Sequence, residues 1–293
     1  MISSNSPSWL VTGAGGMLGL DLVAALTDQG IEHVAADRSA LDVTDAEAVR
    51  RAVRSLGPQG VVLNAAGWTD VDGAEEHEAE ATAVNGTAVE ALARACRTIG
   101  ALLVHVSTDY VFGGDGLVVD ELAEDAVPAP INAYGRSKLV GERAVLHHCP
   151  DTGYVVRTAW LYGRHGENFV RTMLRLAATH DSVTVVDDQV GQPTWTVEVA
   201  RRMIDIGLRR PPPGVLHGSA AGETSWYGLA RAAYELAGLD PARVQPVPSS
   251  RFPRPAVRPE RSVLGHDRWS LTGLSPLPDW RAMLDQAWAA GVF

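Results

Sequence analysis

The stretch Trp9-Leu10-Val11-Thr12-Gly13-Ala14-Gly15-Gly16-Met17-Leu18-Gly19 joins a short apolar run to a glycine-rich turn near the start of the chain. Its glycines fit G-x-x-G-x-x-G at positions 13, 16 and 19, and Leu18 breaks the G-x-G-x-x-G spacing. Glycines at such a turn let backbone N–H groups approach a pyrophosphate at a helix N-terminus. The sequence therefore predicts a strand, a phosphate-binding turn and a helix over 17–27, with cofactor contacts from Gly13, Gly16, Met17, Leu18 and Gly19.

Apolar runs and helical segments alternate from this turn to about residue 160. Four further runs have the length and composition of strands, at 34–36, 61–63, 102–106 and 154–156. Regular strand–helix alternation is typical of an α/β fold with a doubly wound parallel sheet of the Rossmann type. The first half of the chain is therefore predicted to bind a dinucleotide.

After residue 163 the pattern loosens. Helices are predicted over 167–178, 197–208, 226–237 and 278–289, and short strands over 184–186 and 215–217. Residues 187–194 are predicted to form a polar loop. We expect a NAD(P)-binding domain over 1–163, joined by later segments such as 194–218, and a smaller mixed lobe over 164–293 that binds substrate at the carboxyl ends of the strands.

The composition is that of an ordinary globular protein. The 293 residues are 46% hydrophobic and carry a net charge of −10, which disfavours nucleic-acid binding as the main task. The two cysteines, Cys96 and Cys149, suggest neither a disulfide framework nor a zinc site. Residues 1–8 lack a basic start and an apolar run, and no stretch approaches about 18 uninterrupted apolar residues. We therefore expect a cytoplasmic protein without a membrane span.

Residues after the second and third predicted strands are candidates for contacts with the adenosine half of the cofactor. Asp37 lies about 20 residues beyond the glycines, where an acid accepts a hydrogen bond from the ribose, whereas Arg38 suits a 2′-phosphate. The pair leaves NAD and NADP open, and Asp37 also fits a simple turn cap. Asp42, next to Val43, is a candidate for the adenine amino group. Small residues after the third strand let a flat cofactor pass close to the backbone, namely Ala65, Ala66 and Gly67.

The strand over 102–106 leads to Thr108, and Tyr134 and Lys138 follow at i, i+4 spacing. On a helix these two side chains share a face, where an ammonium would lower the pKa of a phenol from its reference of about 10. A tyrosine, a lysine and a hydroxyl at the carboxyl end of a sheet suit proton transfer to a carbonyl oxygen, coupled to hydride transfer. The plainer alternative is an aromatic at a helix start and a solvated lysine.

Arginines accompany prolines and aromatics in the C-terminal region, at Arg251, Arg254, Arg258 and Arg261. Such a mixture is usually a surface feature. The functional alternative is a contact with the anionic phosphate of a nucleotide-sugar, for which Arg258 is the candidate.

With these residues in place, the chain resembles the extended short-chain dehydrogenase/reductase superfamily and, within it, the dTDP-4-dehydrorhamnose reductases. The matching segments cover nearly the whole chain: 13–19, 64–67, 107–112, 134–142, 157–163, 188–194, and Arg258-Pro259 with Ser262 and Leu264. The resemblance implies that Tyr134 is the general acid, Lys138 its electrostatic partner and ribose ligand, and Thr108 the hydroxyl that binds the reacting oxygen. It also places Trp160 near the sugar, with Thr69 and Asp109 close to the same pocket.

Two positions refine this resemblance. Related nucleotide-sugar 4,6-dehydratases have Thr-Asp-Glu where this chain has Thr108-Asp109-Tyr110. Dehydration needs a carboxyl group that protonates the leaving hydroxyl, so we expect simple ketone reduction. Some members of the rhamnose branch are dimers bridged by magnesium through glutamates. Asp21 stands at the first such position, but Gly291-Val292-Phe293 offers no carboxylate side chain, so a metal is not expected.

The resemblance implies reduction of the C4 ketone of a dTDP-4-keto-6-deoxyhexose by NADPH, or by NADH. The first expectation is conversion of dTDP-4-dehydrorhamnose to dTDP-L-rhamnose. Two alternatives are a 4-ketoreductase for another nucleotide-activated deoxysugar of natural-product biosynthesis, and a cofactor-binding regulatory subunit like that of methionine adenosyltransferase. The intact Thr108, Tyr134 and Lys138 set favours catalysis. We expect a nucleotide-sugar substrate, neither nucleic acid nor membrane as a partner, and a monomer or homodimer.

Overall fold

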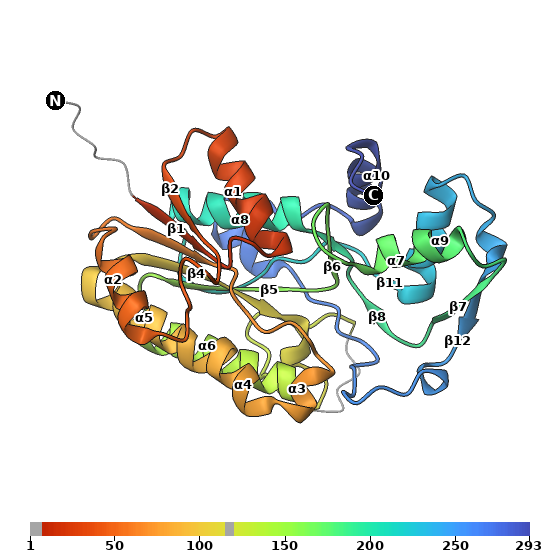
Figure 1. The fold of residues 1–293 in the computed structure, drawn as a ribbon, viewed down its shortest axis with the longest axis horizontal. Coiled ribbons are helices and arrows are strands. Elements are labelled where there is room, and N and C mark those ends of the chain that lie inside the picture. Colours follow the sequence, from red (N-terminus) through yellow and green to blue (C-terminus); the bar gives the residue numbers. More distant parts are fainter. Residues whose placement is uncertain (1–7, 115–119) are drawn as a thin grey trace.

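The computed structural model describes residues 8–114 and 120–293. The polar start of the chain, on which the expected absence of a leader was based, lies almost wholly outside the described residues. Six parallel strands form the main sheet (Figure 1), in the order β10 (Gly214–His217), β5 (Gly153–Thr158), β4 (Leu102–Thr108), β3 (Val61–Asn64), β1 (Trp9–Thr12) and β2 (His33–Ala36). This arrangement confirms the predicted α/β fold with a doubly wound sheet.

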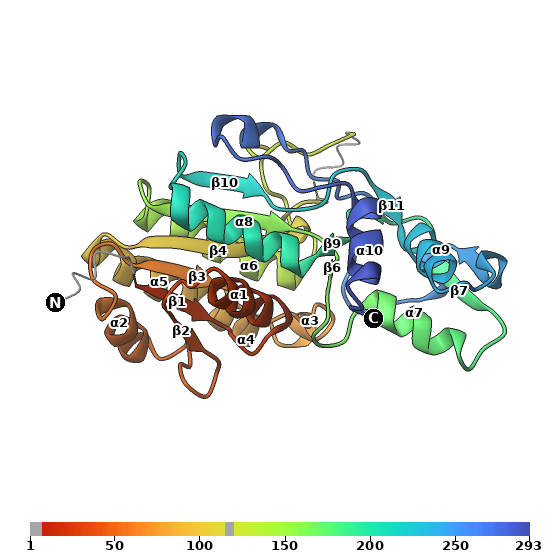
Figure 2. The same cartoon turned by 90° about the horizontal axis from the view of Figure 1, so that it is seen from above.

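Helices cover both faces of the sheet. One face packs against α1 (Met17–Asp28) and α8 (Thr196–Arg209), which contact each other, and the other against α2 (Ala46–Arg54), α5 (Ala88–Ile99) and α6 (Ala133–His148) (Figures 1 and 2). Successive strand residues point to opposite faces. Val11 and Leu63 accordingly belong to the core under α1 and α8, whereas Leu10 and Val62 belong to the core under α2 and α5.

Short helical segments connect β3 to α5. They are α3 (Gly73–Glu76), α4 (Glu78–Thr82) and a π-helical turn over Ala83–Thr87. Further 3₁₀ turns span Asp109–Val111, Pro241–Arg243, Ser249–Arg251 and Asp267–Leu271. π-Helical turns are rare and occur often at functional sites. The turn here lies on the path from the third strand to the helix that precedes β4.

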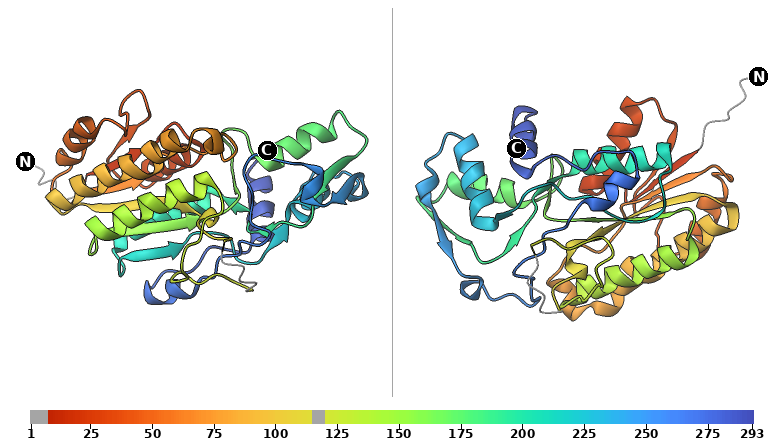
Figure 3. Two further views of the ribbon diagram at one scale, coloured as in Figure 1. Left: turned by 90° about the horizontal axis from the view of Figure 1, so that it is seen from below. Right: turned by 180° about the vertical axis from the view of Figure 1, so that it is seen from behind.

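The C-terminal part forms a smaller lobe beyond the carboxyl ends of the strands (Figure 3). Its elements are α7 (Phe169–Ala177), β7 (Val183–Val186), α9 (Trp226–Leu236), β12 (Val244–Val247) and α10 (Trp280–Ala289). Three strands of two residues, β8 (Val190–Gly191), β9 (Thr194–Trp195) and β11 (Thr224–Ser225), and the similarly short β6 (Leu161–Tyr162) complete it. The polar loop predicted over 187–194 therefore contains β8 and the start of β9, because two-residue strands are too short to produce a periodic signal.

A buried ion pair fastens α6 to β5 next to the carboxyl ends of the strands. Arg157 Nε and Nη2 donate to the two carboxylate oxygens of Glu142 at 2.9 and 2.8 Å, and the side chains are only 3% and 2% exposed. The Arg157 guanidinium also lies over the Phe112 ring, 4.8 Å from its centroid. The pair fixes the helix that carries Tyr134 against the strand that leads to Trp160.

No helix within 8–114 or 120–293 is both long and apolar enough to cross a membrane.

Candidate active site

The first turn of α6 brings Tyr134 to the end of β4. Asn132 caps this helix, since its side chain accepts from Gly135 N at 2.8 Å and donates to Val257 O at 2.9 Å. Gly135 allows close packing, because a Cβ at this position would lie 2.0 Å from the Tyr110 carbonyl oxygen. The helix can therefore place the Tyr134 ring edge to face with that of Tyr110, with 6.0 Å between the centroids.

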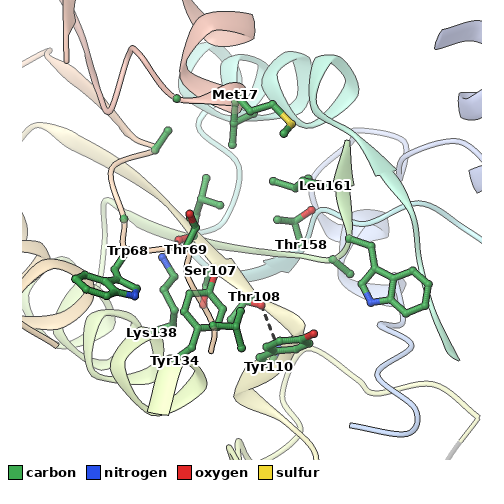
Figure 4. Close-up of a pocket in the computed structure, with 18 of the residues that line it drawn as sticks. Met17, Trp68, Thr69, Ser107, Thr108, Tyr110, Tyr134, Lys138, Thr158 and Leu161 are labelled. Carbon is green, nitrogen blue, oxygen red and sulfur yellow. Dashed lines mark hydrogen bonds between the residues drawn. The ribbon is translucent and has the colours of Figure 1, made fainter. Parts of the chain in front are cut away.

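Hydrogen bonds connect Thr108, the last residue of β4, to its surroundings. Thr108 Oγ1 accepts from Tyr110 N at 3.2 Å and donates to Asp109 Oδ1 at 3.0 Å. Asp109 Oδ2 accepts from Ser262 Oγ at 2.6 Å, which fastens the C-terminal segment to the strand end. Figure 4 shows Thr108 and Tyr134 directed into one cavity. The hydroxyl and the phenol predicted to act together thus meet at the carboxyl end of the sheet.

Burial governs the ionisation of the two α6 side chains. It raises the pKa of the Tyr134 phenol above its ordinary value, and the charge of Asp109 acts in the same direction. Burial also lowers the pKa of Lys138 to about 8, with the charge of Glu142 opposing it. Lys138 Nζ donates to Val106 O at 2.6 Å. The phenol pKa is therefore raised, contrary to the prediction from the i, i+4 spacing of Tyr134 and Lys138, because burial removes hydration from the phenolate.

The π-helical turn places Asn85 behind the loop that follows β3. Asn85 Oδ1 accepts from Trp68 N at 2.8 Å, and Nδ2 donates to Ser137 Oγ at 2.9 Å. A Cβ on Gly67 would lie 3.1 Å from Asn85 Oδ1 and 3.9 Å from Lys138 Nζ. Asn85 therefore holds the predicted cofactor-binding backbone beside Lys138.

The residues predicted to react line a cavity of about 520 Å³ between the sheet and the smaller lobe. Its walls include the three predicted catalytic residues Thr108, Tyr134 and Lys138. They also include three residues predicted to lie near the substrate, and four residues of the glycine-rich turn that are predicted to bind the cofactor. The first set is Thr69, Asp109 and Trp160, and the second is Gly16, Met17, Leu18 and Gly19. Figure 4 shows Met17 and Leu161 on the wall opposite Tyr134 and Lys138. The structure thus brings together side chains from five separate parts of the sequence.

Two stacked indoles close the lobe side of this cavity. The rings of Trp160 and Trp226 lie 3.5 Å apart at an interplanar angle of 6°. Trp160 has a left-handed backbone, with φ at 44°, and a Cβ on Gly191 would lie 2.7 Å from its ring. Trp226 Nε1 donates to Gln189 Oε1 at 3.2 Å. Sequence reasoning missed Trp226, because a tryptophan at the start of a helix is most simply a packing residue.

A second cavity, of about 490 Å³, meets the first along Gly16 and residues 65–68. Its other lining residues include predicted cofactor ligands, namely Gly13, Asp37, Arg38, Asp42 and Val43. A Cβ on Gly13 would lie 2.5 Å from Ala66 N, so this turn has room only for glycine. Gly16 precedes α1 without a side-chain cap, which leaves the N–H groups of its first turn for a ligand. The glycine-lined backbone and these N–H donors fit the phosphates of a dinucleotide.

The acidic side chains of this second cavity form turns of their own. Asp37 Oδ1 accepts from Ser39 N at 2.8 Å, Ser39 Oγ at 2.7 Å and Ala40 N at 3.0 Å, and these bonds lower the pKa of Asp37. Asp42 Oδ1 accepts from Thr44 N and Thr44 Oγ1 in the same manner. Asp37 therefore caps a turn, as the plainer alternative expects, but only through Oδ1. Arg38 lines the same cavity beside Asp37.

Arg258 lies away from the lining of both cavities. Its guanidinium donates to both carboxylate oxygens of Asp72 at 2.9 Å, and this contact holds the pKa of Asp72 below its usual value. The positive charge of Arg258 also acts on the neighbouring Tyr110 hydroxyl. Its predicted contact with substrate phosphate stays a prediction.

Asp21 is buried beside α8, with only 7% of the residue exposed. Its carboxylate accepts from Thr196 Oγ1 at 2.5 Å, and His165 Nε2 lies 3.8 Å away. Burial raises the pKa of Asp21. Within the described ranges, no three His, Cys, Asp or Glu side chains form a group that could hold a metal ion.

Known proteins share both the sequence and the fold. The chain matches the family described as RmlD substrate binding domain over residues 8–292. It is 51% identical over 279 residues to dTDP-4-keto-6-deoxy-D-glucose reductase of Streptomyces niveus, covering 95% of this chain and 96% of the relative. It is 50% identical over 288 residues to dTDP-4-dehydrorhamnose reductase of Streptomyces griseus, covering 97% and 94%. The crystal structure of dTDP-4-dehydrorhamnose reductase from Bacillus anthracis in complex with NADP superposes with a TM-score of 0.91 at 33% identity, covering 97% and 99%.

Proposed function

This chain belongs to the dTDP-4-dehydrorhamnose reductase family, and we propose that it reduces the C4 ketone of a dTDP-4-keto-6-deoxyhexose with Tyr134 as the proton donor. It is an NAD(P)H-dependent reductase of a dTDP-sugar ketone. The observation that carries the assignment of residues is the convergence of Thr108, Tyr134 and Lys138 on one cavity. That cavity meets the second cavity at the glycine turn, so a hydride donor bound there and a ketone would meet beside these side chains.

The bound cofactor supplies the hydride, and the protein controls the proton. Burial keeps the Tyr134 phenol protonated, so the proton is available when a more basic alkoxide forms at the former carbonyl oxygen. Lys138, held at Val106 O, offers N–H donors to the cofactor ribose and positive charge to the phenolate that remains. Thr108 Oγ1 lies next to the phenol and orients the carbonyl oxygen toward it.

We propose NADPH as the preferred cofactor. Asp37 Oδ1 already accepts three hydrogen bonds from Ser39 and Ala40. These bonds weaken the ability of this oxygen to accept a further bond from a ribose hydroxyl. Arg38 and Ser39 line the same cavity and suit a 2′-phosphate as a guanidinium and a hydroxyl donor. The NADP complex of the Bacillus anthracis relative supports this choice. Asp37 Oδ2 can still accept from a 2′-hydroxyl, so slower turnover with NADH is expected.

For the sugar, we propose dTDP-4-dehydrorhamnose as substrate and dTDP-L-rhamnose as product. The Streptomyces griseus relative, at 50% identity, is a reductase of that substrate. The Streptomyces niveus relative, at 51% identity, is a dTDP-4-keto-6-deoxy-D-glucose reductase, and this likeness favours a second candidate substrate. Both relatives are reductases, so they give no support to the alternative of a regulatory subunit.

The packing of the helices and strands supports a division of the chain into two domains. We propose that the cofactor domain comprises most of residues 8–163 together with 196–217, because α8 packs on α1 and β10 extends the sheet at β5. The remaining C-terminal segments form the substrate lobe. A monomer or a homodimer stays the prediction for the quaternary state.

The experiment that tests this function supplies dTDP-4-keto-6-deoxyglucose with and without a 3,5-epimerase. Nicotinamide absorbance is followed with NADPH and NADH in parallel, and the product sugar is identified. Oxidation that requires the epimerase and yields dTDP-L-rhamnose is the expected result. Oxidation of NADPH or NADH without the epimerase would identify dTDP-4-keto-6-deoxyglucose, the second candidate, as the substrate. No cofactor oxidation with either ketone would contradict the proposal.

A further inference from the structure

The hydrogen bonds of the Thr108 hydroxyl leave it no proton for a substrate. A hydroxyl has one proton and two acceptor positions. In this structure the proton goes to Asp109 Oδ1, and one acceptor position receives Tyr110 N–H. The remaining acceptor position is what Thr108 can present to the cavity that it lines together with Tyr134. With Asp109 ionised, Thr108 therefore turns a lone pair, and not an O–H, toward an incoming carbonyl oxygen.

Asp109 is buried, and each of its two carboxylate oxygens accepts a hydrogen bond from a neighbouring hydroxyl. Only 2% of the Asp109 surface is exposed, and Asp109 Oδ2 accepts a hydrogen bond from Ser262 Oγ at 2.6 Å. Burial raises the pKa of Asp109 to about 6, against the hydrogen bonds from Ser262 and Thr108, which lower it. Asp109 therefore changes charge close to physiological pH, in direct contact with the hydroxyl that must orient the ketone.

The other ionisable groups around Asp109 leave its charge uncompensated. The phenols of Tyr110, from the same turn, and Tyr134, from α6, face it, and its charge raises the pKa of both. The C-terminal segment contributes the neutral Ser262 hydroxyl. Arg258, beside Tyr110, is paired with Asp72. An ionised Asp109 would thus stand near the alkoxide that forms during reduction, and repel it.

We propose that Asp109 is a positioning residue that sets the direction of the Thr108 hydroxyl, so that the enzyme is competent for reduction when Asp109 is protonated. The proposal rests on the proposed function. A protonated Asp109 donates its O–H to Thr108 Oγ1, and Thr108 then donates to the carbonyl oxygen. The Asp109 proton is not consumed, because Tyr134 supplies the proton that the alkoxide takes.

The dependence of kcat/KM on pH distinguishes this role from a merely structural one. Wild-type kcat/KM for the keto-sugar should fall above the Asp109 ionisation, by about tenfold per pH unit, until a floor is reached. Asp109→Asn keeps the size of the side chain and carries a permanent N–H donor for Thr108 and an acceptor for Ser262. This variant should show no such fall and should exceed wild type by at least about tenfold near pH 8.

Ser262→Ala provides an independent variant with a signed expectation. It removes a hydrogen bond that favours the ionised carboxylate, so the fall should move to higher pH by at least about half a unit. Initial rates of NADPH oxidation between about pH 5 and 9, with folding checked by circular dichroism, give the profiles.

The proposal would be overturned if the pH profile of Ser262→Ala were not shifted, or if kcat/KM of Asp109→Asn fell with pH as in wild type. A folded Asp109→Asn variant that is inactive at every pH would overturn it as well. In all three cases wild-type ketone reduction would still uphold the proposed function. Absence of wild-type reduction would contradict that function instead.

Discussion

Replacing Glu142 by Gln is expected to lower the free energy of unfolding by about 3–5 kcal/mol. The magnitude follows from the surroundings of the pair: Arg157 and Glu142 are 3% and 2% exposed and share two hydrogen bonds. Glutamine preserves the size of the side chain but turns an N–H₂ group toward one of the arginine donors. The guanidinium then remains buried without its counter-charge, which accounts for most of the loss.

A matched control lies on the same helix. Arg136 of α6 makes the same two-bond contact with Glu78 at 2.7 and 2.8 Å, but these side chains are 44% and 45% exposed. Glu78→Gln should therefore cost less than about 1 kcal/mol. Urea unfolding followed by circular dichroism measures both variants against wild type.

A double replacement tests the cause of the loss. Glu142→Met combined with Arg157→Met should regain much of the stability lost in Glu142→Gln, because it removes the unpaired charge as well as the pair. Equal small losses of stability in Glu142→Gln and Glu78→Gln would show that burial does not set the cost of removing the carboxylate. The explanation by an unpaired buried charge would also fail if the double variant lost as much stability as Glu142→Met and Arg157→Met lose in sum when each is made alone.

Three further outcomes are expected. Lys138→Met should abolish activity but raise the free energy of unfolding near neutral pH, because burial depresses the folded pKa of Lys138 to about 8. In the unfolded chain the lysine pKa is near 10.4, so the free energy of unfolding of wild type rises between about pH 8 and 10. The difference in stability between Lys138→Met and wild type should therefore shrink over this range, and urea titrations at several pH values measure it. Trp226→Ala removes the indole stacked on Trp160 and should raise KM for the keto-sugar about tenfold with a smaller change in kcat, while Trp226→Phe retains most of the affinity. Arg38→Ala should raise KM for NADPH about tenfold and leave KM for NADH within about twofold, in steady-state assays with each cofactor.

Local patterns in the sequence were sufficient to predict the first half of the fold and the centre of the site. An apolar run before Gly13 and a helical period after it predicted β1 and α1. The i, i+4 spacing of Tyr134 and Lys138 placed them on one face of α6, and the end of an apolar strand placed Thr108 at the carboxyl edge of the sheet. Each of these inferences depends on a period or a turn within about 20 residues.

Contacts between distant segments were beyond the reach of such patterns. Ser262 meets Asp109 across 153 residues of sequence, and Trp226 meets Trp160 through the packing of α9 on the rest of the lobe. Neither contact has a periodic signal. The direction of the pKa shift at Tyr134 also depends on burial, which only the packed site determines.

The most direct test of the central claim compares Tyr134→Phe with wild type. Phenylalanine keeps the aromatic ring and removes only the hydroxyl that we propose as the proton donor. NADPH oxidation by the keto-sugar gives kcat, and fluorescence titration gives the Kd for NADPH. We predict a loss in kcat of at least about 100-fold with the Kd changed less than about twofold. Nearly full turnover by a variant that still binds NADPH would contradict the account.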